Sequence, residues 1–286
     1  MEQIIYLNGL LVSRKDATIS PFDHGFLYGY SLFETMRAYR GHVFRLERHL
    51  ARLARSARIV GLELGIFDLE KATYETLEAN NLMSARVRLT ISRGEGEMTP
   101  DPATCHGPTV LIVAQSYAPL PDETYQRGFK AVISQVRQNS QSPLSRVKSA
   151  NYLNNILARM EARVAGADEA LLLNERGFLA EGSASNIFLI SGGNLLTPSE
   201  ESGALPGITR EAVLELALAL GIKAVQREVA LEELWQADEA FLTNSLLEIM
   251  PVTEVGGHPI GLGIAGPVTR ALIAAYKEPV QKEVGL

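Results

Sequence analysis

The spacing of apolar residues changes several times within the first 116 residues. Residues 4–12 predict a β-hairpin that turns at Asn8-Gly9, a residue pair that favours the backbone of a two-residue turn. Apolar residues then recur at helical spacing over residues 46–59 and 68–80. Further strands are predicted at 31–40, 42–44, 85–92 and 109–115. Together these elements predict a small N-terminal α/β domain over residues 1–116.

A second set of elements is predicted beyond residues 117–128, where two prolines among polar side chains indicate an interdomain linker. Residues 129–286 are expected to form a larger C-terminal domain. Its predicted helices lie at 151–165, 208–220, 231–236 and 267–276. Its predicted strands lie at 129–136, in a meander over 170–182 and 185–197, and at 223–229 and 239–243. Because helices and strands mix without an internal repeat, the predicted fold class is α+β in two domains.

The composition and charge of the chain narrow the class of partner. Of its 286 residues, 46% are hydrophobic and 21% charged, and the formal net charge is -6. A nucleic-acid-binding protein would present a basic stripe, which this mixture of signs does not suggest. We therefore expect no nucleic-acid partner and a small-molecule substrate.

The cysteines, histidines and apolar stretches exclude several further classes of site. Cys105 is the only cysteine, so neither an internal disulfide nor a cysteine-based zinc site can form. The five histidines lack metal-ligand spacing, and no metal is expected. The first residues do not resemble a signal peptide, and no stretch reaches the roughly 18 uninterrupted apolar residues of a membrane span. The sequence predicts a cytoplasmic protein without a membrane partner.

Lys148 is the first candidate for chemistry. It precedes the helix predicted at 151–165, and both the positive end of that helix dipole and the nearby Arg146 disfavour the ammonium form. Only a neutral amine attacks an aldehyde, so such a lysine suits Schiff-base chemistry. The alternative is a solvated loop lysine, which the placement alone favours.

Three other features suggest an anionic ligand, and each has a structural alternative. Glu181 lies among small residues, where it either approaches a ligand closely or faces water. Residues 207–209 open a predicted helix whose free N–H groups suit a phosphate, although Thr209 could simply cap that helix. Arg86 and Arg88 share one strand face, which suits carboxylate recognition or exposure to solvent.

Six blocks of sequence carry a resemblance to a known family. In chain order they are SPFDHGFLYGYSLFETMRAYRG, HLARL, VKSANYLNN, AEGSASNIF, LPGITRE and TNSLLEIMPV. They span about residues 4–255 and resemble the class-IV aminotransferases, which are fold-type IV enzymes dependent on pyridoxal 5′-phosphate (PLP). The resemblance implies the two-domain fold of D-amino-acid aminotransferases with PLP as cofactor. It also implies a homodimer with shared active sites, in which residues 26–30 contribute to the partner's pocket.

The same resemblance assigns roles to individual residues. The K-S-x-N block implies that Lys148 carries PLP as a Schiff base and is the catalytic residue. The H-x-x-R-L block assigns Arg52 to the cofactor phosphate, and the E-G-x-x-S-N block assigns Glu181 to the pyridinium nitrogen. The other implied cofactor contacts are Ile208, Thr209, Ser245 and Tyr152, the last standing four residues after the lysine where branched-chain aminotransferases have five. The implied substrate contacts are Tyr28, Phe33, Thr35, Arg37, Arg88, Asn244 and Leu246.

Three reactions known in this family are candidates for the activity of this chain. The segment SRGEGEMTPDPATCH has no arginine after Arg93, which weakens the interpretation of this chain as a D-amino-acid aminotransferase. Thr35 stands where branched-chain aminotransferases have the glycine of F-E-G-I-R, and Asn244-Ser245 replaces the start of their G-T-A. The blocks look most like aminodeoxychorismate lyases, with Arg88 holding the substrate carboxylate. The sequence therefore predicts elimination of pyruvate from 4-amino-4-deoxychorismate to give 4-aminobenzoate. The alternative is transamination between D- or branched-chain L-amino acids and 2-oxo acids.

Overall fold

The computed structural model describes residues 2–285 and separates into two compact units. The first comprises residues up to 118 together with 147–151 and 283–285, and the second comprises 119–146 and 152–282. The expected linker at 117–128 contains helix α4 (Asp122–Arg127), which belongs to the second unit. The segment around Lys148 belongs to the first unit, although the sequence assigned it to the C-terminal domain.

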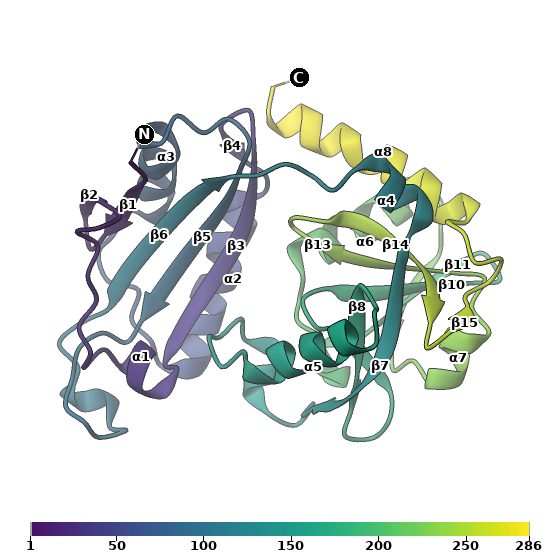
Figure 1. Cartoon of the computed structure of the whole chain (residues 1–286), viewed down its shortest axis with the longest axis horizontal. Helices are drawn as coiled ribbons and strands as arrows, with labels where there is room; N and C mark the ends of the chain where they lie inside the picture. Colours follow the sequence, from purple (N-terminus) through teal and green to yellow (C-terminus); the bar gives the residue numbers. More distant parts are fainter. Residues whose placement is uncertain (1, 286) are drawn as a thin grey trace. The chain divides into compact units, whose positions relative to one another are not determined.

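The described part of the first unit forms an antiparallel sheet of six strands in the order β2-β1-β6-β5-β3-β4. The strands are β1 (Ile4–Leu7), β2 (Leu10–Ser13), β3 (Ser31–Tyr39), β4 (His42–Val43), β5 (Ala85–Ser92) and β6 (Thr109–Ser116). The helices are α1 (His24–Tyr28), α2 (Leu46–Val60) and α3 (Leu69–Ala79). Helices α2 and α3 cover one face of this sheet (Figure 1). The predicted strands and helices of this half are confirmed.

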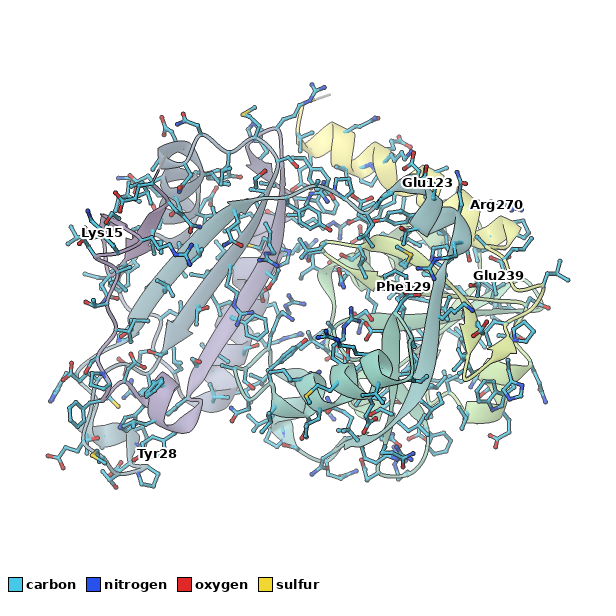
Figure 2. All side chains as sticks on the ribbon, in the orientation of Figure 1. Lys15, Tyr28, Glu123, Phe129, Glu239 and Arg270 are labelled. Carbon is cyan, nitrogen blue, oxygen red and sulfur yellow. The ribbon has the colours of Figure 1, made fainter. Side chains whose placement is uncertain are left out.

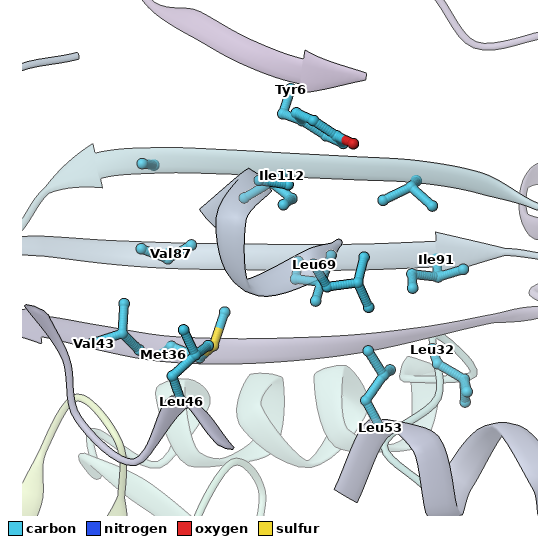
Figure 3. Close-up of a cluster of buried hydrophobic side chains, with 14 of the residues drawn as sticks. Tyr6, Leu32, Met36, Val43, Leu46, Leu53, Leu69, Val87, Ile91 and Ile112 are labelled. Atoms are coloured by element: carbon cyan, nitrogen blue, oxygen red, sulfur yellow. The ribbon is translucent and has the colours of Figure 1, made fainter. Parts of the chain in front are cut away.

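Alternation along the strands separates a buried face from a polar face. Val87, Leu89 and Ile91 of β5 are fully buried against the helices, whereas Arg86 and Arg88 point to the opposite face and are exposed. Side chains of β3, β5 and β6 meet those of α2 and α3 in one apolar cluster (Figure 3). Burial of each large aliphatic side chain stabilises the unit by about 1.5–3 kcal/mol.

The two hairpins turn where glycine allows left-handed backbone. Asn8 and Gly9 have φ of 49° and 93°, and Arg40 and Gly41 have 51° and 84°. Both central residues of each turn therefore adopt positive φ, as the type I′ turn of a tight hairpin requires. In the first hairpin this turn sets the register in which Leu7 faces Leu10.

The described part of the second unit contains a larger mixed sheet, in the order β12-β11-β10-β13-β14-β7-β8-β9, with β15 beside β14. Its strands are β7 (Phe129–Gln138), β8 (Glu169–Asn174), β9 (Leu179–Gly182), β10 (Asn186–Ser191), β11 (Asn194–Pro198), β12 (Ala224–Arg227), β13 (Glu239–Asn244), β14 (Glu248–Val255) and β15 (His258–Pro259). Its other helices are α5 (Leu153–Val164), α6 (Ile208–Ala219), α7 (Leu231–Trp235) and α8 (Pro267–Glu283). The mixture of helices and strands confirms the α+β class.

Strand β14 was missed by the sequence analysis because of Pro251. Proline donates no hydrogen bond and is rare in central strands, yet β14 lies between β13 and β7. The register of β14 against β7 shifts between Val252 and Glu254, directly after the proline. A bulge is one of the places where a strand accommodates proline. Helix α8 also runs past its predicted end, because Val280 beyond Pro279 is buried.

Helix α5 lies on β7 and β8 through small side chains. Ala158 and Ala162 are fully buried against Ala170 and Leu172 of β8. Its other side is apolar and exposed, with Val164 90% and Met160 57% exposed. Among residues 2–285, no helix combines the length and apolar character needed to cross a membrane.

Candidate active site

Lys148 is fixed by its backbone to the edge of the first sheet. The carbonyl of Lys148 accepts a hydrogen bond from the N–H of Phe33 at 2.9 Å, and the N–H of Ala150 donates to Ser31 at 2.8 Å. Its neighbour Val147 is buried in the apolar cluster of this unit. The lysine is half-buried, and its Nζ lies 4.6 Å from the centroid of the Phe33 ring. Lys148 therefore stands on a defined strand edge rather than in a loop that is free of the sheet.

The predicted substrate residues of β3 and β5 share the sheet face that the helices do not cover. Phe33, Thr35 and Arg37 alternate along β3, and Thr35 lies directly across from Arg88 of β5. The guanidinium carbon of Arg88 lies 3.5 Å from the centroid of the Phe33 ring. Since Lys148 contacts the same ring, this face brings together an amine, an aromatic surface and a guanidinium group.

Arg37 is a buried charged side chain on this face. It is 6% exposed, and its guanidinium carbon lies 4.4 Å from the ring centroid of Tyr117 and 4.6 Å from that of Tyr39. Among the described residues, its Nε and Nη1 have no hydrogen-bond acceptor. A buried donor left without an acceptor costs about 1–3 kcal/mol, and more when it is charged. A carboxylate of a ligand would satisfy these donors.

Arg52 lies on the helical side of the same sheet, in a cluster that the sequence analysis missed. Its Nε donates to Glu34 Oε1 at 2.8 Å and its Nη2 to Glu34 Oε2 at 2.5 Å. His49 Nδ1 lies 2.7 Å from the same Oε2. All three side chains are buried. The sequence signal for this cluster was the H-x-x-R-L block, in which His49 and Arg52 are three residues apart on α2 and so face the same way.

The charges of this cluster are set by burial and by the arginine. Burial disfavours ionisation of Glu34, but the charge of Arg52 and the hydrogen bond from His49 outweigh it and lower the carboxyl pKa to about 2. Burial lowers the pKa of His49, and the positive charges of Arg52 and Lys148 act in the same direction. His49 is therefore neutral at pH 7 and must carry its proton on Nδ1 to donate to the carboxylate.

In the second unit, Glu181 is a buried carboxylate held by two donors. The N–H of Leu205 donates to Oε2 at 2.9 Å, and Gln138 Nε2 donates to Oε1 at 3.4 Å. Arg210 is buried nearby, and burial lowers its pKa while the charge of Glu181 opposes that shift. Glu181 is buried and does not face water. Of the two alternatives for Glu181, its burial therefore supports the close approach to a ligand.

The loop that follows Glu181 is tied to two other predicted site residues. Tyr152 donates its hydroxyl proton to the carbonyl of Ser183 at 3.2 Å, and Asn155 donates to the same oxygen at 2.9 Å. Asn244 Nδ2 donates to the carbonyl of Ala184 at 3.0 Å. The start of α5 and the end of β13 therefore meet at this loop.

The start of α6 is built to leave its backbone N–H groups open. Gly207 is the N-cap residue, and no side chain caps the helix. A Cβ at Gly207 would come within 1.9 Å of Asn186 Oδ1, while Asn186 Nδ2 donates to the carbonyl of Leu205 at 2.8 Å. Ile208 and Thr209 follow as buried residues of the first turn. An uncapped N-terminus of a twelve-residue helix favours a bound anion.

Asn244 also shapes the turn between β13 and β14. Its Oδ1 accepts hydrogen bonds from the N–H groups of Leu246 at 2.9 Å and Leu247 at 2.8 Å, which fixes Ser245 between them. Asn186 lies directly across from Thr243, the residue before this turn. The hydroxyl of Thr243 is buried and has no hydrogen-bond partner among residues 2–285, a polar group that the sequence analysis did not single out.

Tyr28 is not brought together with the other predicted residues by any contact of the described structure. It ends α1 and is 39% exposed (Figure 2). Its ring packs edge-on against that of His24, with the two ring centroids 4.9 Å apart. The five-residue helix is capped by Asp23, whose side chain accepts from the N–H of Gly25.

Each unit, taken by itself, carries groups that fit PLP. The second unit offers an uncapped helix N-terminus for a phosphate, a buried carboxylate at Glu181 and the unpartnered hydroxyl of Thr243. The first unit offers Lys148 and a buried arginine at position 52. Carboxylate, phosphate-binding amides and an amine are the groups that the pyridinium nitrogen, the phosphate and the aldehyde of PLP require.

A family model for class IV amino-transferases matches residues 31–255. This chain belongs to the class IV aminotransferases. It is 41% identical to a putative branched-chain-amino-acid aminotransferase of Methanocaldococcus jannaschii over 277 residues, covering 96% of this chain and 95% of that protein. It is 36% identical to the aminodeoxychorismate lyase of Bacillus subtilis over 285 residues, covering 98% and 96%.

The comparison with solved structures gives the same family. The branched-chain amino acid aminotransferase of Escherichia coli matches with a TM-score of 0.92 at 34% identity, covering 97% of this chain and 94% of that chain. Another branched-chain amino acid aminotransferase, solved with pyridoxamine 5′-phosphate, also matches with a TM-score of 0.92, at 32% identity. The predicted fold-type IV architecture is confirmed, and so is a PLP-dependent enzyme with PLP as its cofactor.

The prediction of aminodeoxychorismate lyase activity is wrong. The branched-chain aminotransferase of M. jannaschii matches more closely than the lyase, and both matched structures are also branched-chain aminotransferases. The prediction relied on the look of the six sequence blocks, and on Thr35 and Asn244-Ser245, which differ from the branched-chain pattern. These are short segments and single positions, and the agreement over the whole chain outweighs them.

Proposed function

We propose that this protein is a PLP-dependent aminotransferase that moves an amino group between branched-chain L-amino acids and 2-oxo acids. The observation that carries the proposal is the 41% identity over 96% of the chain to a putative branched-chain-amino-acid aminotransferase. A branched-chain aminotransferase structure with a TM-score of 0.92 supports it. The class of cofactor chemistry follows from the family, and the substrate class follows from these relatives.

We assign the cofactor-holding roles to residues whose surroundings suit them. Bound PLP supplies an electron sink that stabilises negative charge beside the amino nitrogen. Lys148 is the residue to which the cofactor would attach covalently, and the carboxylate of Glu181 would accept a hydrogen bond from the protonated ring nitrogen. The first-turn amides of Ile208 and Thr209, with Ser245 and Arg52, bind the phosphate. Tyr152 packs at the loop after Glu181 and would contact the bound cofactor.

The catalytic proton transfer is assigned to the Nζ of Lys148. This amine lies 4.6 Å from the centroid of the Phe33 ring, and in its neutral form it can accept a proton. Arg37 and Arg88 lie on the same strand face and supply guanidinium groups for the substrate carboxylate. Phe33 provides apolar contact for an aliphatic side chain. Thr35, Asn244, Leu246 and Tyr28 complete the proposed substrate contacts.

A homodimer with shared active sites is part of the proposal. The exposed apolar residues of α5 recur at helical spacing, namely Leu153, Ile156, Leu157, Met160 and Val164. Phe26 of α1 is 77% exposed, beside the partly exposed Tyr28. Such apolar surface is unusual on a monomer, and two-fold dimers are the commonest way to cover it. The cytoplasm remains the predicted compartment.

The substrate class is tested with a panel of amino acids. The purified protein, loaded with PLP, is incubated with 2-oxoglutarate and with L-leucine, L-isoleucine, L-valine, D-alanine or L-aspartate. We expect the three branched-chain L-amino acids to be converted at least about tenfold faster than the others, as measured by chiral chromatography of the products. Faster turnover of D-alanine would assign the enzyme to D-amino acids, and no turnover of any donor would refute an aminotransferase.

A further inference from the structure

The carboxylate of Glu34 holds the guanidinium of Arg52 in one orientation. Its two oxygens accept from Nε and Nη2 of Arg52 in a bidentate pair. Such a fork fixes the plane and direction of a guanidinium group, and not only its distance. Arg52 and Glu34 come from α2 and β3, so the orientation is built into the packing of the helix on the sheet.

His49 fixes the carboxylate in turn. Its Nδ1 donates to Oε2, the oxygen that also accepts from Arg52 Nη2. Three donors therefore converge on the two oxygens of a side chain that is 0% exposed. Neither the carboxylate nor the guanidinium can rotate without breaking a hydrogen bond in a place that water does not reach.

The charges of the three side chains and the nearby Lys148 suit a role beside an anion-binding site. Glu34 and Arg52 together are neutral, and His49 is uncharged at pH 7, so the arginine is held without a second positive group beside it. The charge of Lys148 contributes to lowering the pKa of His49, which places the cofactor lysine in the electrostatic neighbourhood of the cluster. A buried ion pair is no more stabilising than apolar side chains of the same volume, so its geometry is its specific contribution.

We propose that Glu34 and His49 are positioning residues that aim the guanidinium of Arg52 at the phosphate of the cofactor. The proposal rests on the phosphate role assigned to Arg52 under the proposed function. Glu34 and His49 themselves do not touch the cofactor. Their effect is to reduce the rotational freedom that Arg52 would otherwise lose when the phosphate binds.

Substitution of Glu34 by glutamine isolates this effect. Glutamine has nearly the same volume but only one oxygen, so it cannot accept from Nε, Nη2 and the imidazole together. Its NH₂ group would also face one of these donors. Glu34→Asp keeps the charge and retracts the carboxylate by one methylene, so it serves as a milder variant of the same contact.

The readout is the preference of the apo-protein for PLP over pyridoxal, which has the same aldehyde and ring but no phosphate. Both dissociation constants are measured by absorbance titration. We expect Glu34→Gln to weaken PLP binding about tenfold or more while pyridoxal binding changes less than about twofold. Glu34→Asp and His49→Phe should reduce the preference by about threefold. Arg52→Lys should reduce it at least as much as Glu34→Gln.

Glu239→Gln is the matched control. Glu239, labelled in Figure 2, is also a buried acid. Its oxygens accept from the N–H groups of Val268 and Thr269 at the start of α8. Its loss should lower thermal stability and leave the preference for PLP over pyridoxal unchanged. Equal weakening of both ligands by Glu34→Gln, or an unchanged preference in Glu34→Asp, would overturn the positioning role.

The remaining outcomes separate this proposal from the proposed function. An unchanged preference in Arg52→Lys would show that the phosphate is held elsewhere and would overturn the premise for Glu34 and His49, while leaving the aminotransferase intact. A wild-type protein that binds neither PLP nor pyridoxal would overturn the proposed function itself. A reduced preference confined to the Arg52, Glu34 and His49 variants supports the positioning role.

Discussion

Replacement of Gly207 by alanine tests how closely the start of α6 is packed. The backbone at this residue has φ of −73° and ψ of 137°, which alanine adopts without strain. The added Cβ would lie 1.9 Å from Asn186 Oδ1, whereas ordinary contact begins near 3.4 Å. The amide of Asn186 would have to retreat by about 1.5 Å, a shift that a close-packed interior resists. Any effect of the substitution is therefore steric.

Displacement of the Asn186 amide would disturb both the start of α6 and Glu181, which are predicted to contact the cofactor. Asn186 Nδ2 holds the carbonyl of Leu205, and the N–H of Leu205 holds Glu181 Oε2. Overpacking of a filled site costs about 1–3 kcal/mol. We expect the free energy of unfolding of the apo-protein to fall by about that amount. We expect PLP affinity to fall about tenfold, since both the helix start and Glu181 are disturbed.

The assay is titration of the apo-protein with PLP, followed by its visible absorbance, together with denaturant unfolding. Asn186→Ala supplies the control, because it removes the oxygen that the new methyl group would meet. In that background Gly207→Ala should cost at least about 1 kcal/mol less stability than in the wild type. Equal costs in both backgrounds, or wild-type affinity and stability in the single variant, would refute the steric reasoning.

Four further predictions concern attachment, catalysis, assembly and pH. Borohydride reduction followed by peptide mapping should place the pyridoxyl group on Lys148, and a label on another lysine contradicts the assignment. Glu181→Gln should retain the covalently bound cofactor but lower kcat by about tenfold or more, equivalent to about 1.4 kcal/mol of barrier or above, because an amide does not hold the ring nitrogen protonated; steady-state rates decide it. Met160→Asp should shift sedimentation from dimer towards monomer by placing a charge in the apolar face of α5, and an unchanged dimer would locate the interface elsewhere. Glu34 has a folded-state pKa of about 2, below its ordinary 4.5, so its contribution of about 3 kcal/mol is present above pH 4.5 and lost as the pH falls towards 2; unfolding midpoints of wild type and Glu34→Gln should converge over that interval.

The local elements of the fold could be predicted because each has a regular apolar period. Strand β5 alternates buried and exposed side chains as its sequence indicates, and α2 begins at Leu46 as expected. The tight turn at Asn8-Gly9 could be predicted because both of these residue types readily adopt positive φ. These properties depend on residues close together in sequence.

The features that could not be predicted depend on packing between distant segments. Strand β14 contains Pro251, which local rules exclude from a central strand, but Pro251 pairs with Phe241 of β13 and the register against β7 begins only at Val252. Lys148 follows the second unit's first strand in sequence, yet its segment pairs with β3 of the first unit. The Glu34–His49–Arg52 cluster forms only because α2 packs on β3. The acid and the histidine both lie in the blocks that carry the family resemblance, but the sequence does not show that their side chains meet.

The choice of reaction shows a different limit of prediction from single residues. Thr35 and Arg88 were interpreted as groups that would recognise a lyase substrate, and the structure does place them across from each other on one face. A guanidinium beside a hydroxyl binds a carboxylate equally well in an amino acid or in a chorismate derivative. Removal of a proton beside the amino nitrogen by Lys148 is also required in both reactions. Residue types at these positions therefore identify the carboxylate and the proton transfer. The fate of the substrate depends on the complete shape of the pocket, which relatives matched over the whole chain report better than one position does.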